Sequence, residues 1–108
     1  MGRALCNRIF PLDCNRDEVE NEIYDVAQRE GDVRGNPFEA DIEWLTRKPF
    51  SSKEEAFEWL ENEVENRAER CFCAYYCPLA VRYSGWVTKR DGKRVEESGW
   101  AVHFEFHV

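Results

Sequence analysis

Cysteine and histidine are the residue types in this sequence best suited to metal or redox chemistry, and the 108 residues include five cysteines and two histidines. Cys71, Cys73 and Cys77 form a C-x-C-x3-C pattern, while Cys6 and Cys14 lie far upstream. Structural zinc sites need four ligands, usually from paired knuckles, and redox motifs usually have the spacing C-x-x-C. The pattern matches neither, and aromatic residues lie between the cysteines, so we expect buried or half-buried thiols that pack against the core. A metal-binding or thiol module built on the C-x-C-x3-C cysteines is the alternative.

The two histidines, His103 and His107, flank Glu105 in a segment where apolar residues alternate with polar ones. This alternation predicts a strand, on which the two histidine Cα atoms would lie about 13 Å apart, too far to share one metal ion. We therefore expect both histidines and Glu105 to be solvated on an exposed face of a sheet.

Motifs of catalysis are missing from the sequence. It contains no nucleophile elbow, no Ser-His-Asp order and no glycine-rich phosphate-binding loop. With 22 acidic residues, some carboxylates must lie close together whatever the function, so their proximity alone indicates no acid–base pair. We expect a non-catalytic protein without a cofactor.

A cluster of cations around the dipeptide Asp91-Gly92 is the strongest functional signal. Four basic residues flank one carboxylate there, which gives this turn a charge of +3 in a chain whose net charge is −7. Such a tip could bind an acidic surface or a phosphate backbone, or could simply protect exposed strand ends and keep the protein soluble. If no bulge intervenes, Trp86 falls on the strand face opposite Tyr83, where it would be exposed and could add an apolar anchor. The candidate binding residues are Trp86, Lys89, Arg90, Lys93 and Arg94.

The remainder of the chain is strongly acidic, which argues against direct binding of nucleic acid over a broad face. The partner that we expect is another protein. A second alternative is an inhibitor that mimics nucleic acid, because acidic residues recur along one predicted helix at positions Glu54, Glu58, Glu61, Glu65 and Glu69.

Two helices are predicted from capping boxes. Asn15 and Ser52 are each followed three residues later by Glu, and each precedes an apolar stripe at helical spacing. We expect these helices to end at Gly31 and near Arg70.

Strands are predicted on both sides of the second helix. Apolar residues alternate with acidic ones over 38–44, after a loop at 32–37, and a weaker pattern favours a strand over 3–10. Asp91-Gly92 is typical of a two-residue hairpin turn, which would pair Arg90 with Lys93. Glycines at 85 and 99 could mark a bulge that alters the pairing. Without one, the register gives the apolar pairs Tyr83–Trp100, Val81–Val102 and Leu79–Phe104.

Together these elements predict an α+β fold in a single domain spanning 1–108. Two helices should pack on one face of a three- to four-stranded, mainly antiparallel sheet that ends in a long C-terminal β-hairpin, with the other face wet. No apolar stretch reaches the length of a membrane span, and the N-terminal segment is too broken for a secretory signal. We expect a cytoplasmic protein with reduced cysteines.

The segments FSSKEEA at 50–56 and LAVRY at 79–83 resemble small proteins of phages and plasmids. Some proteins of that kind block host defence systems, so the resemblance implies an interaction protein. Our leading hypothesis is a small acidic protein that binds another macromolecule through charged surfaces.

Overall fold

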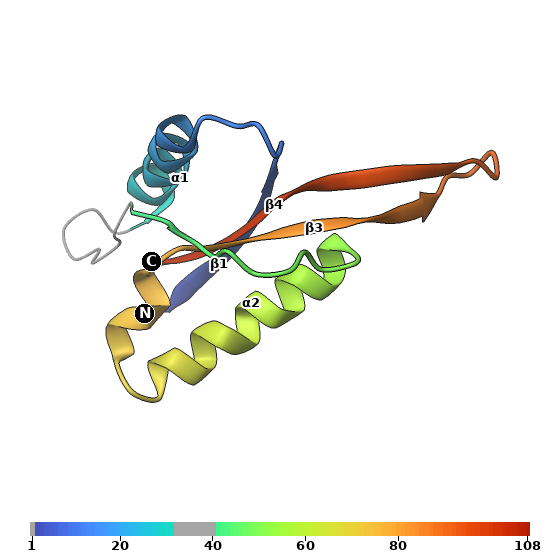
Figure 1. Cartoon of the computed structure of the whole chain (residues 1–108). Coiled ribbons are helices and arrows are strands. Elements are labelled where there is room, and N and C mark those ends of the chain that lie inside the picture. Colours follow the sequence, from blue (N-terminus) through green and yellow to red (C-terminus); the bar gives the residue numbers. More distant parts are fainter. Residues whose placement is uncertain (1, 32–40) are drawn as a thin grey trace.

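The structure, a computed structural model, describes residues 2–31 and 41–108, with the side chain of Cys73 outside the description. Two helices pack against a four-stranded mixed sheet whose last two strands form a long hairpin, which confirms the α+β class (Figure 1). The elements are β1 (Arg3–Phe10), α1 (Arg16–Glu30), β2 (Glu43–Trp44), α2 (Lys53–Ala68), the 3-10 helix η1 (Phe72–Tyr76), β3 (Leu79–Thr88) and β4 (Arg94–His107).

Both predicted helix starts are confirmed by their capping hydrogen bonds. The backbone N–H of Glu18 donates to Oδ1 of Asn15 at 3.2 Å, and the N–H of Glu55 donates to Oγ of Ser52 at 3.2 Å. The weakly predicted strand β1 is also present. Of the strand predicted over 38–44, the structure shows Glu43–Trp44 as β2, and residues 41–42 are not part of a strand, so the prediction was too long there. Residues 38–40 and the loop predicted at 32–37 lie outside the described residues.

The sheet has the strand order β1-β4-β3-β2, in which β1 and β3 pair antiparallel with β4 and the short β2 pairs parallel with β3. β4 is therefore a central strand, paired along most of its length on both sides. In the described ranges, no helix has the length and apolar character required to cross a membrane.

The hairpin turn differs from the predicted two-residue turn. The N–H of Lys89 donates to the carbonyl of Lys93 at 2.8 Å, so Arg90, Asp91 and Gly92 form a three-residue loop. Gly92 has a φ of +84°, the left-handed conformation that closes such loops. The longer loop moves the register by one residue, so Tyr83 lies opposite Gly99 and the three predicted apolar pairs are wrong.

The two helices lie on opposite faces of the sheet, so the prediction that both cover one face and leave the other wet is also wrong. The core under α1 joins Val19 and Ile23 to one set of strand residues, Ala80, Trp100, Val102, Phe104 and Phe106. The core under α2 joins Ala56 and Leu60 to the other set, Leu79, Val81, Tyr83 and Ala101. Because alternate side chains of a strand point to opposite faces, the corrected register gives the hairpin base two apolar faces, and each requires a helix.

Candidate functional site

The distal half of the hairpin extends past the ends of both helices and carries the predicted binding residues (Figure 1). Residues 86–96 are all exposed, and the cationic turn lies at the far end of this projection. The N–H of Lys93 donates to Oδ1 of Asp91 at 3.0 Å, so the single carboxylate of the loop helps to hold the loop backbone. The structure thus places the predicted cations where a partner could reach them.

One of the four tip cations has an internal partner. Nζ of Lys89 lies 2.9 Å from Oε1 of Glu97, which is on the neighbouring strand. The hydrogen bond and the charge of Lys89 hold the pKa of Glu97 below its ordinary value. Arg90, Lys93 and Arg94 form no ion pair with any residue of the described part of the chain. The uncompensated charge of the tip therefore belongs to these last three residues.

Trp86 lies beside these cations, on the sheet face opposite Tyr83, as the sequence predicted. Its side chain is 62% exposed, a large apolar surface without cover. The guanidinium of Arg94 lies 5.6 Å from the centroid of the Trp86 ring, within the range of a cation–π interaction. Trp and Arg are both enriched in interface hot spots, and here the two side chains lie together on an exposed face, with Glu96 opposite Trp86 on the neighbouring strand.

The cysteines lie in two different settings. Cys6 and Cys14 are half-buried against the α1 core, as expected, and burial raises the pKa of both thiols. Cys71 and Cys77 are exposed at either end of η1, so their predicted burial is wrong. Among the described side chains, no three His, Cys, Asp or Glu residues are placed to hold a metal ion. The position of Cys73 is not part of that description, so the three-cysteine module remains a hypothesis.

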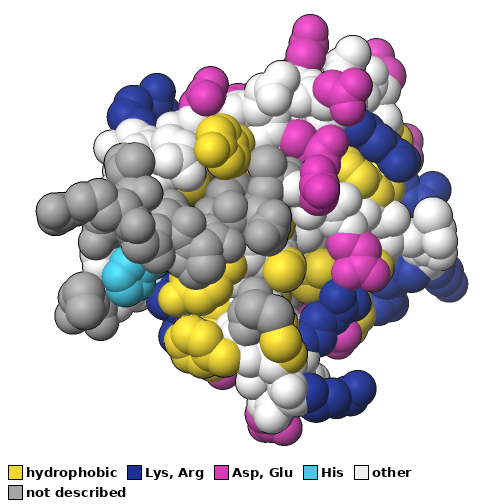
Figure 2. Space-filling model, turned by 90° about the vertical axis from the view of Figure 1, so that its left-hand side faces the viewer, with side chains coloured by type: hydrophobic (Ala, Val, Ile, Leu, Met, Phe, Trp, Pro, Cys, Tyr) yellow, Lys and Arg dark blue, Asp and Glu magenta, His cyan; other side chains and the backbone are white. Residues whose placement is uncertain are grey.

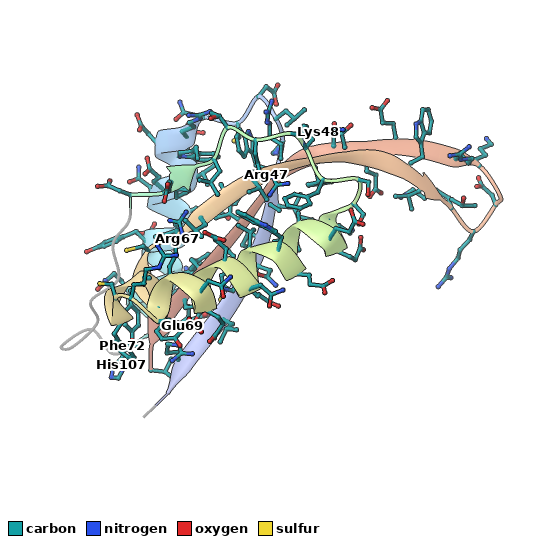
Figure 3. All side chains as sticks on the ribbon, turned by 60° about the horizontal axis from the view of Figure 1, so that its bottom comes forward. Arg47, Lys48, Arg67, Glu69, Phe72 and His107 are labelled. Carbon is teal, nitrogen blue, oxygen red and sulfur yellow. The ribbon has the colours of Figure 1, made fainter. Side chains whose placement is uncertain are left out.

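η1 lies at the end of the molecule opposite the hairpin tip, where hydrophobic side chains are visible at the surface (Figure 2). Phe72 belongs to this end and is 64% exposed, and Figure 3 shows His107 at the same end. Phe72 packs edge-on against Tyr75, with ring centroids 5.2 Å apart. Of the aromatic residues between the cysteines, Phe72 is thus exposed, whereas Tyr75 also packs against the α2 core and Tyr76 is buried.

A buried polar network is the main feature that sequence reasoning missed. His103 and Glu105, predicted to be solvated, are 0% and 3% exposed. Nδ1 of His103 lies 2.7 Å from Oδ1 of Asn7, and its Nε2 lies 2.8 Å from Oε2 of Glu105. Nε of Arg3 donates to Oε1 of Glu105 at 2.9 Å. The network ties the edge strand β1 to the central strand β4.

This network is structural in character. Both ring nitrogens of His103 and both oxygens of Glu105 already have partners, and neither residue is open to solvent. The guanidinium of Arg3 is further covered by the ring of Tyr75, at 3.6 Å from its centroid. A general acid or base must reach its substrate, and these groups reach only one another. The sequence analysis did not predict that β4 is a central strand with both faces buried, and it therefore placed His103 and Glu105 on a solvated face.

Comparison of the chain with protein families, with curated proteins and with solved structures finds no match. Function is therefore inferred here from the geometry and chemistry of the described residues.

Proposed function

We propose that this protein is a non-catalytic interaction protein whose hairpin tip binds an acidic surface of another protein. The observation that carries the proposal is the exposed Trp86 ring beside Arg94, on a projecting hairpin whose turn also carries Arg90 and Lys93. None of these three cations forms an ion pair among the described residues. An apolar anchor rimmed by arginine supplies affinity, and the net positive tip steers an acidic partner toward it. A small protein that blocks a host defence system would act through such a surface.

The charge distribution favours a protein partner over nucleic acid. The chain carries 22 acidic against 15 basic residues. Glu54, Glu58 and Glu65 of α2 are exposed, as is Glu69 directly after it. A nucleic acid long enough to contact more than the tip would meet these carboxylates and be repelled. A folded partner with a local acidic patch would contact the projecting tip alone.

The test is affinity capture with mass spectrometry, comparing the wild-type protein with a variant that carries Trp86→Ala, Arg90→Glu, Lys93→Glu and Arg94→Glu. We expect the variant to lose the partner because both the anchor and the charge are removed. A matched control reverses three exposed cations elsewhere, Arg8, Arg29 and Arg70, and should retain it. Capture of the same proteins by the wild type and the tip variant would refute the proposal.

Two further arms separate the alternatives. Nuclease treatment before capture should leave the partner bound, whereas its loss would indicate nucleic acid at the tip. Excess DNA should not displace the partner, because displacement would favour mimicry of nucleic acid by the acidic surface. For the cysteine module, zinc in protein purified without chelator, together with loss of thermal stability in EDTA, would support metal binding.

A further inference from the structure

A pocket of about 400 Å³ lies at the base of the hairpin, away from the tip. Three separate parts of the chain enclose it: the start of α1, the segment before α2, and the paired strands β3 and β4. Figure 3 labels Arg47 and Lys48 on that segment before α2, which runs along the edge of β3 and is hydrogen-bonded to it at Leu45 and Phe50. The lining residues are Leu12, Arg16, Pro49, Arg82, Tyr83, Ser84 and Trp100.

Two guanidinium groups lie close to the indole of Trp100, and both of their residues line the pocket. Cζ of Arg16 lies 5.4 Å from the ring centroid and Cζ of Arg82 lies 5.9 Å from it. Arg16 also lies 4.8 Å from the ring of Trp44, which packs edge-on against Trp100 with centroids 5.0 Å apart. The two cations are thus held against a rigid aromatic pair, although like charges repel each other.

Neither guanidinium is neutralised by a carboxylate within the described ranges. Arg82 donates from Nη2 to the carbonyl of Arg47 at 2.9 Å, which fixes the position of its side chain. Its Nε is buried and has no hydrogen-bond partner among the described residues. Buried polar groups are nearly always paired in native proteins, so an unpaired donor in a side chain that lines a pocket favours a ligand whose acceptor oxygens reach this guanidinium.

The charge and the walls of the pocket together define the class of ligand. Two arginines match the charge and the acceptor oxygens of a phosphate group better than those of a single carboxylate. Leu12, which is 49% exposed, Pro49 and the edge of Trp100 provide an apolar wall. Ser84 also lines the pocket, but its hydroxyl donates a hydrogen bond to Oε1 of Glu96 at 3.3 Å, so the two arginines are the donors assigned to the phosphate. A molecule that carries a phosphate group on an apolar or aromatic body would match both the arginines and the apolar wall.

We propose that the pocket formed by Arg16, Arg82 and Trp100 binds a small phosphorylated molecule with an apolar or aromatic body. Arg82 and Arg16 hold the phosphate, and the body lies against Leu12 and Pro49. The pocket contains no residue of the hairpin tip, so this proposal can be tested independently of the function proposed for the tip.

Phenyl phosphate is a suitable probe, and the four indole N–H signals of the protein in an NMR titration are a suitable readout. Single Trp→Phe variants assign the signals. At constant ionic strength, we expect a saturable shift of the Trp100 signal, with a dissociation constant in the millimolar range or tighter. Arg82→Gln and Arg16→Gln should each weaken binding about tenfold, because each removes a charge-assisted hydrogen bond. Arg16 is exposed, so its variant tests the site even if Arg82→Gln disturbs the fold.

The matched control is Arg70→Gln, which removes the same charge from an exposed position outside the pocket and should leave affinity unchanged. Inorganic phosphate should bind more weakly than phenyl phosphate, and phenol should not bind. A titration without saturation, or equal affinity in the wild type and both arginine variants, would overturn the proposal. Equal affinity for inorganic phosphate and phenyl phosphate would overturn the assignment of an apolar body.

Discussion

Tyr83 lies opposite Gly99 across the hairpin, and a side chain at position 99 would collide with it. A Cβ atom built on Gly99 would lie 3.0 Å from Oη of Tyr83 and 2.7 Å from the carbonyl oxygen of Phe10. The second contact is with backbone of the neighbouring strand β1, which cannot move away freely. Because Gly99 has no side chain, the ring of Tyr83 and the backbone of β1 can both pack closely against it.

We therefore predict that Gly99→Ala lowers the free energy of unfolding by about 1–3 kcal/mol, as overpacking does elsewhere. Urea denaturation of the purified variant measures this. Gly2→Ala is the control, because a Cβ there meets nothing within 4 Å and should change stability by less than about 0.5 kcal/mol. Equal stability of both variants would show that β1 does not approach Gly99 as described.

The sequence predicted the parts of the fold that depend on local chemistry. The caps at Asn15 and Ser52, the hairpin centred near Asp91 and the exposure of Trp86 all follow from neighbouring residues, and the structure has them. The strand register could not be predicted from the turn sequence, because Asp-Gly suits two-residue and three-residue loops equally well. In the structure, Gly92 is the third residue of a three-residue loop and has a positive φ.

The one-residue difference in hairpin register accounts for most of the errors in the predicted fold. It moves Tyr83 and Trp100 to opposite faces, gives the sheet two apolar sides and separates the helices. The pocket was also hidden, because Arg16 and Arg82 are far apart in sequence and only the fold brings both to the lining of one pocket. The tip cations that the sequence predicted as binding residues are exposed, and the structure adds the internal pairing of Lys89 with Glu97.

The Lys89–Glu97 pair makes a prediction about pH. Because Lys89 holds the pKa of Glu97 below its ordinary value, Lys89→Met should return that pKa toward the ordinary value. A group whose pKa is lowered by folding stabilises the protein above its unfolded pKa, and this contribution disappears as pH falls through the folded pKa. The stability difference between wild type and variant should therefore be present at neutral pH and vanish in acid. An NMR titration of the Glu97 carboxyl measures the pKa directly, and an unchanged value in the variant would contradict the pairing.

The half-buried thiols of Cys6 and Cys14 should react slowly. Burial raises the pKa of both, so less thiolate is present at a given pH, and the thiolate is the form that attacks alkylating reagents. We expect iodoacetamide at pH 8 to label both much more slowly in the folded protein than in urea, as followed by peptide mass spectrometry. Because the pKa of both thiols is raised, their labelling rate should still increase with pH at values where the rate of an unfolded cysteine peptide has levelled off. Equal rates in the folded and unfolded protein would show that α1 does not cover these thiols.

The Arg3–Glu105–His103 network should be a point at which a single substitution is costly. Glu105 accepts hydrogen bonds from Arg3 at 2.9 Å and faces Nε2 of His103 at 2.8 Å, with both His103 and Glu105 buried. Glu105→Leu leaves these two partners without their acceptor, and we predict a loss of about 3–5 kcal/mol in the free energy of unfolding.

The control for that loss is Glu65→Leu, which removes a 62% exposed carboxylate at 4.0 Å from the same Arg3 guanidinium and should cost less than about 1 kcal/mol. Combining Glu105→Leu with His103→Leu should recover part of the stability, because an apolar pair does not require the lost hydrogen bond. Urea denaturation at neutral pH compares the three variants. A cost for Glu105→Leu no larger than that for Glu65→Leu would mean that β1 is held to β4 by its backbone ladder and apolar contacts alone, with no contribution from the buried charges.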